Sequence, residues 1–221
     1  MNSVEEKISV IMPTYNDGKR ISCAINSVRK QTFQGWELIV IDDGSTDNTE
    51  EMITSIKDRR IKYHKIKHVG ITRAINVGLK LCKNEYIARH DADDISMPDR
   101  LELQKKFLDD NVNVGIVGSW IWVMDGNPHL IKPPEIIPDK PLKDIAGCIA
   151  VAGSMFRKSA IKLIGGVDEN YKYAQDYKML IDIKRAGYDI GCVQKNYTNI
   201  RFVVIKYLVN ISQNKTNAVT G

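Results

Sequence analysis

The chain has 221 residues, of which 43% are hydrophobic and 27% are charged. These values are typical of a water-soluble globular protein with a sizeable core. The net charge of +5 is modest, and the basic residues are not interleaved with stacking aromatic residues. This composition argues against a nucleic-acid partner. No window approaches the roughly 20 apolar residues that a membrane-spanning helix needs.

The cysteines, at positions 23, 82, 148 and 192, are far apart and form no CxxC pair. Their spacing fits reduced thiols better than a disulfide framework or a zinc site. The first seven residues are mostly polar, so we expect no signal peptide before Ile8. We therefore expect a cytoplasmic protein, whose basic face suits anionic diphosphates or the anionic inner face of a membrane.

In the first half of the chain, short apolar runs alternate with helical patterns. Strands are predicted at residues 8–12, 36–41, 61–66 and 86–90, and the continuous apolar run at 8–12 is typical of a strand buried on both faces of a parallel sheet. Apolar residues at helical spacing predict helices over 21–28, 47–56 and 70–83, the second beginning with a capping box of Asp47 and Glu50. Strands that alternate with helices predict a parallel, right-handed α/β sheet.

After Pro98 the pattern changes. Helices are predicted over 100–108, 159–164 and 176–186, strands over 114–124 and 155–157, and an irregular loop over 132–141. Residues 201–211 alternate apolar and basic, which fits either a helix resting on a membrane or a segment packed on its own domain. We expect one domain over 1–221, with a first half at 7–98, a second half at 99–191 and an extension at 192–221.

Three polar loops, at 13–17, 42–47 and 91–94, are expected at one edge of the sheet, because ligands bind beyond the carboxyl ends of parallel strands. The third loop places Asp91, Asp93 and Asp94 at the end of a strand, where like charges destabilise a fold unless a cation neutralises them. Mg²⁺ and Mn²⁺ take one or two carboxylates and complete their shell with water and phosphates. We interpret this loop as a metal–diphosphate site; the alternative is an acidic turn that caps the next helix.

Four blocks occur in a fixed order: ISVIMPTYND, VIDDGSTDNTE, GITRAINVGLKLCKNEYIARHDADDISMPDRL and GGVDENYKYAQDYKML. Together they resemble the pattern of glycosyltransferase family 2, over about residues 7–191. The resemblance implies a GT-A fold, a Rossmann-like and mostly parallel central sheet flanked by helices, with nucleotide-binding and acceptor-binding halves. It also implies transfer of a sugar from a nucleotide diphosphate, usually UDP, to an acceptor hydroxyl with inversion.

The resemblance assigns nucleotide contacts to Pro13, Thr14, Tyr15, Asp43, Arg73, Asn76, Asp91 and Ala92. Tyr15 would pack on the base, and Asp43 would hydrogen-bond the uracil edge. Asp42 is expected to point away, because neighbouring side chains on a strand face opposite ways. The alternative for Tyr15 is ordinary loop packing, and for Arg73 it is a solvated helix face.

The segment 91–93 resembles the DxD motif of the family. Asp93 would be the direct ligand of Mn²⁺ or Mg²⁺, and Asp91 would lie toward the ribose or the metal-bound waters. The metal would stabilise the charge on departing UDP. Asp94 is expected to be structural, and His90 is expected to be a packed histidine rather than a ligand.

Inverting transfer requires a base that takes the acceptor proton. The family places a carboxylate at the start of a late helix after a GGxDE block, usually as Glu-Asp, and this chain has Gln175-Asp176 there. Asp176 is therefore the expected base, and its alternative role is that of a helix N-cap. A QxxRW motif, associated with processive relatives, is missing, so we expect transfer of a single sugar.

The leading hypothesis is a metal-dependent inverting glycosyltransferase that acts on a glycan, lipid-linked or other surface-polysaccharide acceptor. A sugar nucleotidyltransferase would require a glycine-rich phosphate loop early in the chain, and Gly18 is the only glycine between Ile8 and Arg20. The third hypothesis is a non-catalytic nucleotide-sugar-binding domain of a larger glycosyltransferase. UDP release from a donor would distinguish it from the first.

Overall fold

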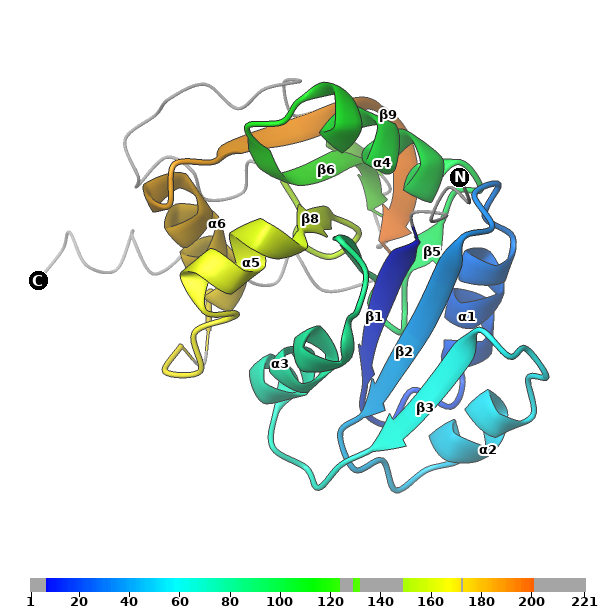
Figure 1. Cartoon of the computed structure of the whole chain (residues 1–221). Coiled ribbons are helices and arrows are strands. Elements are labelled where there is room, and N and C mark those ends of the chain that lie inside the picture. Colours follow the sequence, from blue (N-terminus) through cyan, green and yellow to red (C-terminus); the bar gives the residue numbers. More distant parts are fainter. Residues whose placement is uncertain (1–6, 124–128, 132–148, 172, 201–221) are drawn as a thin grey trace, which may run out of the picture.

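The computed structural model describes residues 7–123, 129–131, 149–171 and 173–200 (Figure 1). The elements in chain order are β1 (Ile8–Thr14), α1 (Ile21–Arg29), β2 (Trp36–Asp42), α2 (Thr49–Thr54), β3 (Ile61–Lys65), α3 (Ile71–Leu81), β4 (Tyr86–Arg89), β5 (Ile95–Ser96), α4 (Arg100–Asp110), β6 (Val114–Val123), β7 (His129–Ile131), β8 (Met155–Arg157), α5 (Lys158–Ile164), α6 (Gln175–Arg185) and β9 (Asp189–Ile200). The loop expected at 132–141 and the segment expected at 201–211 lie outside the described residues.

The first half of the sheet is parallel, as the alternation of strands and helices predicts. β1 pairs in parallel with β2 and β4, and β2 pairs in parallel with β3. Thr14 lies opposite Asp42, and Ile11 lies opposite Arg89. The carboxyl ends of β1, β2 and β4 therefore lie at one edge, and the loops that follow them share that edge.

The second half of the sheet adds antiparallel pairings. The full strand order is β3-β2-β1-β4-β8-β6-β9-β5, with β7 beside β6. β8 is antiparallel to both β4 and β6, whereas β9 runs parallel to β6. The expected boundary at residue 191 falls inside β9, so residues 192–200 belong to the main sheet.

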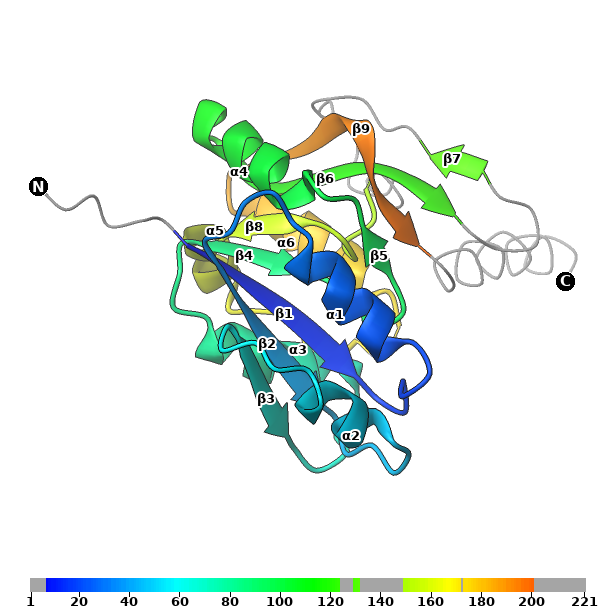
Figure 2. The same ribbon diagram turned by 90° about the vertical axis from the view of Figure 1, so that its right-hand side faces the viewer.

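Helices cover both faces of this sheet (Figures 1 and 2). One core lies between the sheet and α1, α2 and α4, and the other lies between the sheet and α3, α5 and α6. Every residue of β1 is buried, which explains its continuous apolar run. None of the helices in the described segments is both long and apolar enough to cross a bilayer.

The predicted capping box at the start of α2 is wrong. The helix begins at Thr49, and its N-cap residue, Asn48, makes no side-chain cap bond. The Asp47 carboxylate accepts hydrogen bonds from the backbone N–H of Thr49, the first residue of the helix, at 3.0 Å and of Gly18 at 3.1 Å, whereas the Glu50 carboxylate pairs with Lys65 Nζ at 2.8 Å rather than with Asp47. Asp47 thus faces the loop after β1, and it joins that loop to the loop after β2.

A buried arginine stabilises the turn that follows the acidic loop, which is the loop at residues 91–94 after β4. Arg100 is 0% exposed, and its Nη1 donates to the carbonyl oxygen of Arg89 at 3.1 Å. Burial lowers the pKa of Arg100 to about 10, and the charges of Asp94 and Asp91 oppose that effect. Asp94 is 2% exposed, so its carboxylate and Arg100 compensate each other inside the protein.

We expect Arg100→Met to lower the free energy of unfolding by about 3–5 kcal/mol, because it leaves the Asp94 carboxylate buried without its compensating charge. Urea unfolding measures this change. The control is Lys106→Met on the same helix, where an exposed ion pair with Asp110 at 2.7 Å is removed. The control should cost at most about 1 kcal/mol. An equally small loss for Arg100→Met would contradict a structural role.

Candidate active site

The loops that follow β1 and β2 hold each other in place. The backbone N–H of Asn16 donates to Ser45 Oγ at 2.9 Å, and the N–H of Thr46 donates to Asn16 Oδ1 at 2.9 Å. Asn16 has φ 55°, in the left-handed region that Asn tolerates better than most residues. The Asp43 N–H donates to the carbonyl oxygen of Thr14 at 2.9 Å, so the two loops form a continuous wall.

Tyr15 and Asp43, both predicted to hold the nucleobase, come together at this wall. The Asp43 carboxylate is almost fully buried and accepts hydrogen bonds from the N–H of Val69 at 2.7 Å and of Gly70 at 2.9 Å. His68 contacts both predicted residues. Its Nδ1 lies 2.9 Å from Asp43 Oδ2, and its ring stacks on Tyr15 with the centroids 4.3 Å apart. His68 was not among the predicted site residues, although it lies two residues before Gly70.

Asp42 points away from its neighbour, and its predicted structural role is confirmed. Its carboxylate is fully buried and accepts hydrogen bonds from Tyr63 Oη at 2.6 Å and from the Ser45 N–H at 2.7 Å. Burial and the Asp42 carboxylate both raise the pKa of Tyr63, which keeps its hydroxyl protonated as the donor. Asp42 thereby fixes the end of β2.

Arg73 and Asn76 on α3 contact the segment that precedes α6. Arg73 Nε lies 3.1 Å from a carboxylate oxygen of Glu169. The Asn76 amide donates to the carbonyl oxygen of Val167 at 2.8 Å and accepts from the Val167 N–H at 2.9 Å. Its Nδ2 also donates to Glu169 at 2.9 Å. These contacts join the two halves of the fold, and the nucleotide contacts of both residues stay predictions.

The acidic loop after β4 carries the charge crowding that its sequence predicts. Asp93 has a side chain that is 16% exposed, and its Oδ2 lies 3.6 Å from Arg20 Nη1. Burial and the neighbouring Asp91 raise the pKa of Asp93, and the Arg20 charge opposes that rise. Arg20 also pairs with Asp17. Ala92 is buried and packs in the core on the α1 side of the sheet, so its nucleotide contact stays a prediction.

His90 is a packed histidine, as predicted. It is 1% exposed; its Nδ1 lies 2.8 Å from the carbonyl oxygen of Asp91 and its Nε2 lies 3.1 Å from Ser27 Oγ. Burial and the nearby Arg100 lower the pKa of His90 to about 3, so its ring is neutral at pH 7. Its contacts order the acidic loop from behind.

Arg89 is the site residue that the sequence analysis missed. It lies at the end of β4, and its side chain is 4% exposed. Nε and Nη2 donate to the two carboxylate oxygens of Asp91, at 2.9 and 3.3 Å, and Nη1 donates to Asp176 Oδ1 at 2.7 Å. A single guanidinium therefore brings the acidic loop and the predicted base to one site. A charged residue at the end of an apolar strand, beside three carboxylates, was the available signal.

Asp176 lies in the first turn of α6, and its alternative role as the N-cap is wrong. The N-cap position belongs to Ala174, and the helix start has no side-chain cap bond. Ala174 has φ 58°, a left-handed conformation that costs a non-glycine residue roughly 1–2 kcal/mol. Such strain is common at functional sites. The Asp176 side chain is 40% exposed, so its carboxylate is open to solvent beside Arg89.

The donor set at the acidic loop fits a hard divalent cation whose shell the substrate completes. The described residues hold no cluster of three or more His, Cys, Asp or Glu side chains that could hold a metal alone. Asp93 is the carboxylate with the weakest local compensation, because Asp91 is bound by two nitrogens of Arg89. One carboxylate, completed by water and phosphate oxygens, is the arrangement that Mg²⁺ typically uses.

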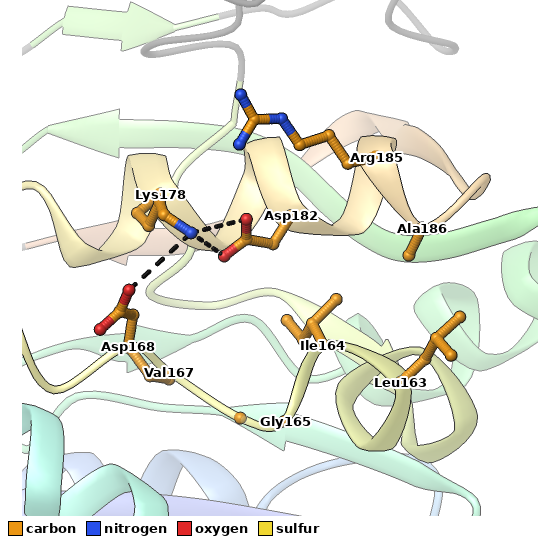
Figure 3. A pocket seen from close by; sticks show the side chains of 10 residues that line it. Leu163, Ile164, Gly165, Val167, Asp168, Lys178, Asp182, Arg185 and Ala186 are labelled. Carbon is orange, nitrogen blue, oxygen red and sulfur yellow. Dashed lines mark hydrogen bonds and ion pairs between the residues drawn. The ribbon is translucent and has the colours of Figure 1, made fainter.

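A separate hollow of about 520 Å³ lies between α5 and α6 (Figure 3). Its polar wall is closed by Lys178, whose Nζ lies 2.7 Å from Asp182 and 3.9 Å from Asp168. Leu163 and Ile164 form its apolar side. The hollow contains none of the predicted site residues, so the candidate site is defined by the loops and Arg89.

The sequence profile of the family described as glycosyl transferase family 2 matches residues 9–165. The chain is 36% identical to the Escherichia coli UDP-Glc:alpha-D-GlcNAc-diphosphoundecaprenol beta-1,3-glucosyltransferase WfgD. The aligned 215 residues cover 95% of this chain and 80% of that protein. It is 45% identical to an uncharacterized glycosyltransferase of Rickettsia conorii, and the aligned 109 residues cover 48% of this chain and 18% of that protein.

Among solved structures, S. aureus TarS 1–349 superposes with a TM-score of 0.75 at 24% identity, over 88% of this chain and 60% of that one. The mannosyltransferase PcManGT of Pyrobaculum calidifontis, in complex with GDP-Man and Mn²⁺, gives a TM-score of 0.71 at 19% identity, over 92% of this chain and 59% of that one. These likenesses confirm the predicted GT-A fold. The family profile and the E. coli relative establish that the chain belongs to glycosyl transferase family 2.

Proposed function

We propose that this chain is an inverting glycosyltransferase that moves one sugar from a nucleotide diphosphate sugar, a UDP-sugar, to a hydroxyl of a glycan or lipid-linked acceptor. The observation that carries the proposal is the Arg89 bridge, because it brings the acidic loop and Asp176 to one site. The E. coli relative is named for a UDP-Glc donor and a diphosphoundecaprenol-linked acceptor. Such an acceptor lies in a membrane, so the proposal includes peripheral association at its cytoplasmic face.

In this proposal the nucleobase binds at the wall formed by the loops after β1 and β2. Tyr15 offers an aromatic face that is 45% exposed, and Asp43 offers a carboxylate for one directional hydrogen bond. Pro13 and Thr14 supply the backbone of the wall. Further contacts to the nucleotide are assigned to Arg73, Asn76, Asp91 and the backbone of Ala92.

Asp93 is the proposed ligand of Mn²⁺ or Mg²⁺, with Asp91 beside it. When bound, such a cation would supply Lewis-acid stabilisation of the charge on the leaving diphosphate. The raised pKa of Asp93 supports this assignment, because burial and Asp91 make an uncompensated charge at Asp93 unfavourable.

Asp176 is the proposed general base. As the acceptor oxygen bonds to the anomeric carbon, its proton passes to the Asp176 carboxylate, and the bond from that carbon to the diphosphate breaks with its electron pair leaving on UDP. A direct displacement of this kind inverts the anomeric centre. Arg89 binds Oδ1 of Asp176, which leaves Oδ2 outside that contact as the proton acceptor.

A thermal-shift experiment tests the donor assignment, because a ligand that binds the folded state raises its stability. UDP-glucose with Mn²⁺, at about 100 times its dissociation constant, should raise the melting temperature by about 5–10 °C. GDP-mannose with Mn²⁺ is the comparison, and UDP-glucose with chelator is the control; both should give smaller shifts. No shift with any nucleotide sugar would contradict the proposal. Binding without UDP release in the presence of acceptor would favour a non-catalytic binding domain.

A further inference from the structure

We propose that Arg89 is a positioning residue. It holds the Asp176 carboxylate where the acceptor hydroxyl can reach it, and it fixes the distance between Asp176 and the acidic loop. The inference rests on the proposed function, since it assigns Asp176 as the base. It adds a residue that does not touch the reacting atoms but determines where the base lies.

The contacts of Arg89 use three of its nitrogens on two carboxylates. Nε and Nη2 bind the two oxygens of Asp91, and Nη1 binds one oxygen of Asp176 at 2.7 Å. A planar guanidinium fixes both the distance and the direction of its partners. A displacement of Asp91 is therefore transmitted to the contact with Asp176.

Arg89 is held more firmly than the carboxylate it binds. β4 lies between β1 and β8 inside the sheet, and the Arg89 N–H donates to the carbonyl oxygen of Ser154 at 2.9 Å. The Arg89 carbonyl oxygen accepts from the buried Arg100. Asp176, by contrast, is 40% exposed and follows Ala174 in a strained conformation. The position of the base carboxylate therefore depends on its contact with β4.

Arg89 stays charged although it is buried, and this charge is needed to bind two carboxylates. Burial opposes a charged guanidinium, but the Asp176 and Asp91 carboxylates outweigh burial and raise the pKa of Arg89. A lysine at this position would keep the charge, but its ammonium lacks the planar fork that spans both carboxylates. The geometry, as well as the charge, is therefore specific to arginine.

The test compares Arg89→Met and Arg89→Lys with the unchanged chain. UDP release is measured with UDP-glucose and Mn²⁺, using a short-chain GlcNAc-diphosphate lipid as the acceptor probe. We expect kcat to fall about 10²-fold in Arg89→Met, because a base misplaced by about 1 Å loses that much rate. Arg89→Lys should lose about 10-fold, as one of the two carboxylates keeps a partner. The affinity for Mn²⁺–UDP should fall by a smaller factor than kcat in both variants, because Arg89 also binds Asp91, which is assigned a nucleotide contact.

The matched control is Arg157→Met on the neighbouring strand β8. Arg157 is also partly buried, but it binds the carbonyl oxygen of Val114 at 2.9 Å and that of Asn111 at 3.2 Å, away from Asp91 and Asp176. The control should lower the melting temperature and leave kcat per folded molecule within threefold. A merely structural role for Arg89 would give the same pattern, and that result would overturn the inference.

Two outcomes separate this inference from the proposed function. If Asp176→Asn is inactive while both Arg89 variants keep full kcat, the inference fails and the base assignment stands. If Asp176→Asn transfers sugar at the normal rate, the base assignment itself fails. Should Arg89→Met not fold, Arg89→Lys decides: a loss of kcat that exceeds the loss of Mn²⁺–UDP affinity supports the inference, and an unchanged kcat overturns it.

Discussion

Replacing Asp176 by Asn is expected to lower the rate of sugar transfer by about 10³-fold, because general-base catalysis typically contributes 10²–10⁴-fold. Asparagine has nearly the same shape as aspartate, and its Oδ1 can still accept the hydrogen bond from Arg89 Nη1, which is 2.7 Å long in the unchanged protein. The substitution therefore removes the proton acceptor with little change in geometry. UDP release measures the expected loss of turnover. Calorimetric titration of Mn²⁺–UDP measures the donor affinity, which should be retained.

The matched control for this experiment is Asp182→Asn on the same helix. Asp182 pairs with Lys178 at 2.7 Å and lines the separate hollow between α5 and α6. Its replacement should leave turnover within about threefold of normal. Equal losses in the two variants would show that α6 tolerates no change of this kind, and full turnover in Asp176→Asn would refute its role as the base.

The second large effect is expected at Asp93, where function and stability should move in opposite directions. Asp93→Asn should weaken Mn²⁺-dependent UDP binding by about 100-fold, since it removes the proposed direct ligand. The same substitution should raise the stability of the metal-free protein at neutral pH. Burial and Asp91 raise the pKa of Asp93, so its negative charge destabilises the folded state wherever it is ionised.

Asp58→Asn is the control of opposite sign. Hydrogen bonds and charge from Arg60 outweigh burial and hold the pKa of Asp58 at about 2. Its contribution to stability is present above the unfolded pKa of about 4 and is lost as the pH falls towards 2. Thermal unfolding at pH 7 without metal should therefore show a loss for Asp58→Asn and a gain for Asp93→Asn. A loss of stability in both, with Mn²⁺–UDP affinity unchanged in Asp93→Asn, would contradict the metal assignment.

The first half of the fold could be predicted from the sequence because β1, β2 and β4 are short, mostly apolar strands that alternate with helical patterns. Every residue of β1 and β4 is buried, and all but Ser9, Thr14 and Arg89 are apolar, so burial and hydrophobicity agree at most positions. The second half could not be predicted in the same way. β9 pairs with β6 from far along the chain, through register shifts near Trp120 that no local pattern specifies.

Part of the site could also be predicted from the sequence. The loop positions of Tyr15 and Asp43 follow from the carboxyl ends of the strands, where the structure places them. Arg89 was missed because its role depends on a contact with Asp176, 87 residues away, and only the tertiary fold reveals that contact. Asp47 also has a contact that its local sequence does not reveal. Its position is typical of a helix cap, but its carboxylate also accepts a hydrogen bond from Gly18 on another loop.

The central claim is that Asp93 and Asp176 act at one site. Its most direct test is the anomalous scattering of Mn²⁺ in crystals grown with Mn²⁺ and UDP. We predict one strong peak within ligand distance of an Asp93 carboxylate oxygen, with the diphosphate between Asp93 and the side chain of Asp176. A peak at another place, or UDP bound beside Tyr15 with its diphosphate turned away from both carboxylates, would contradict this claim.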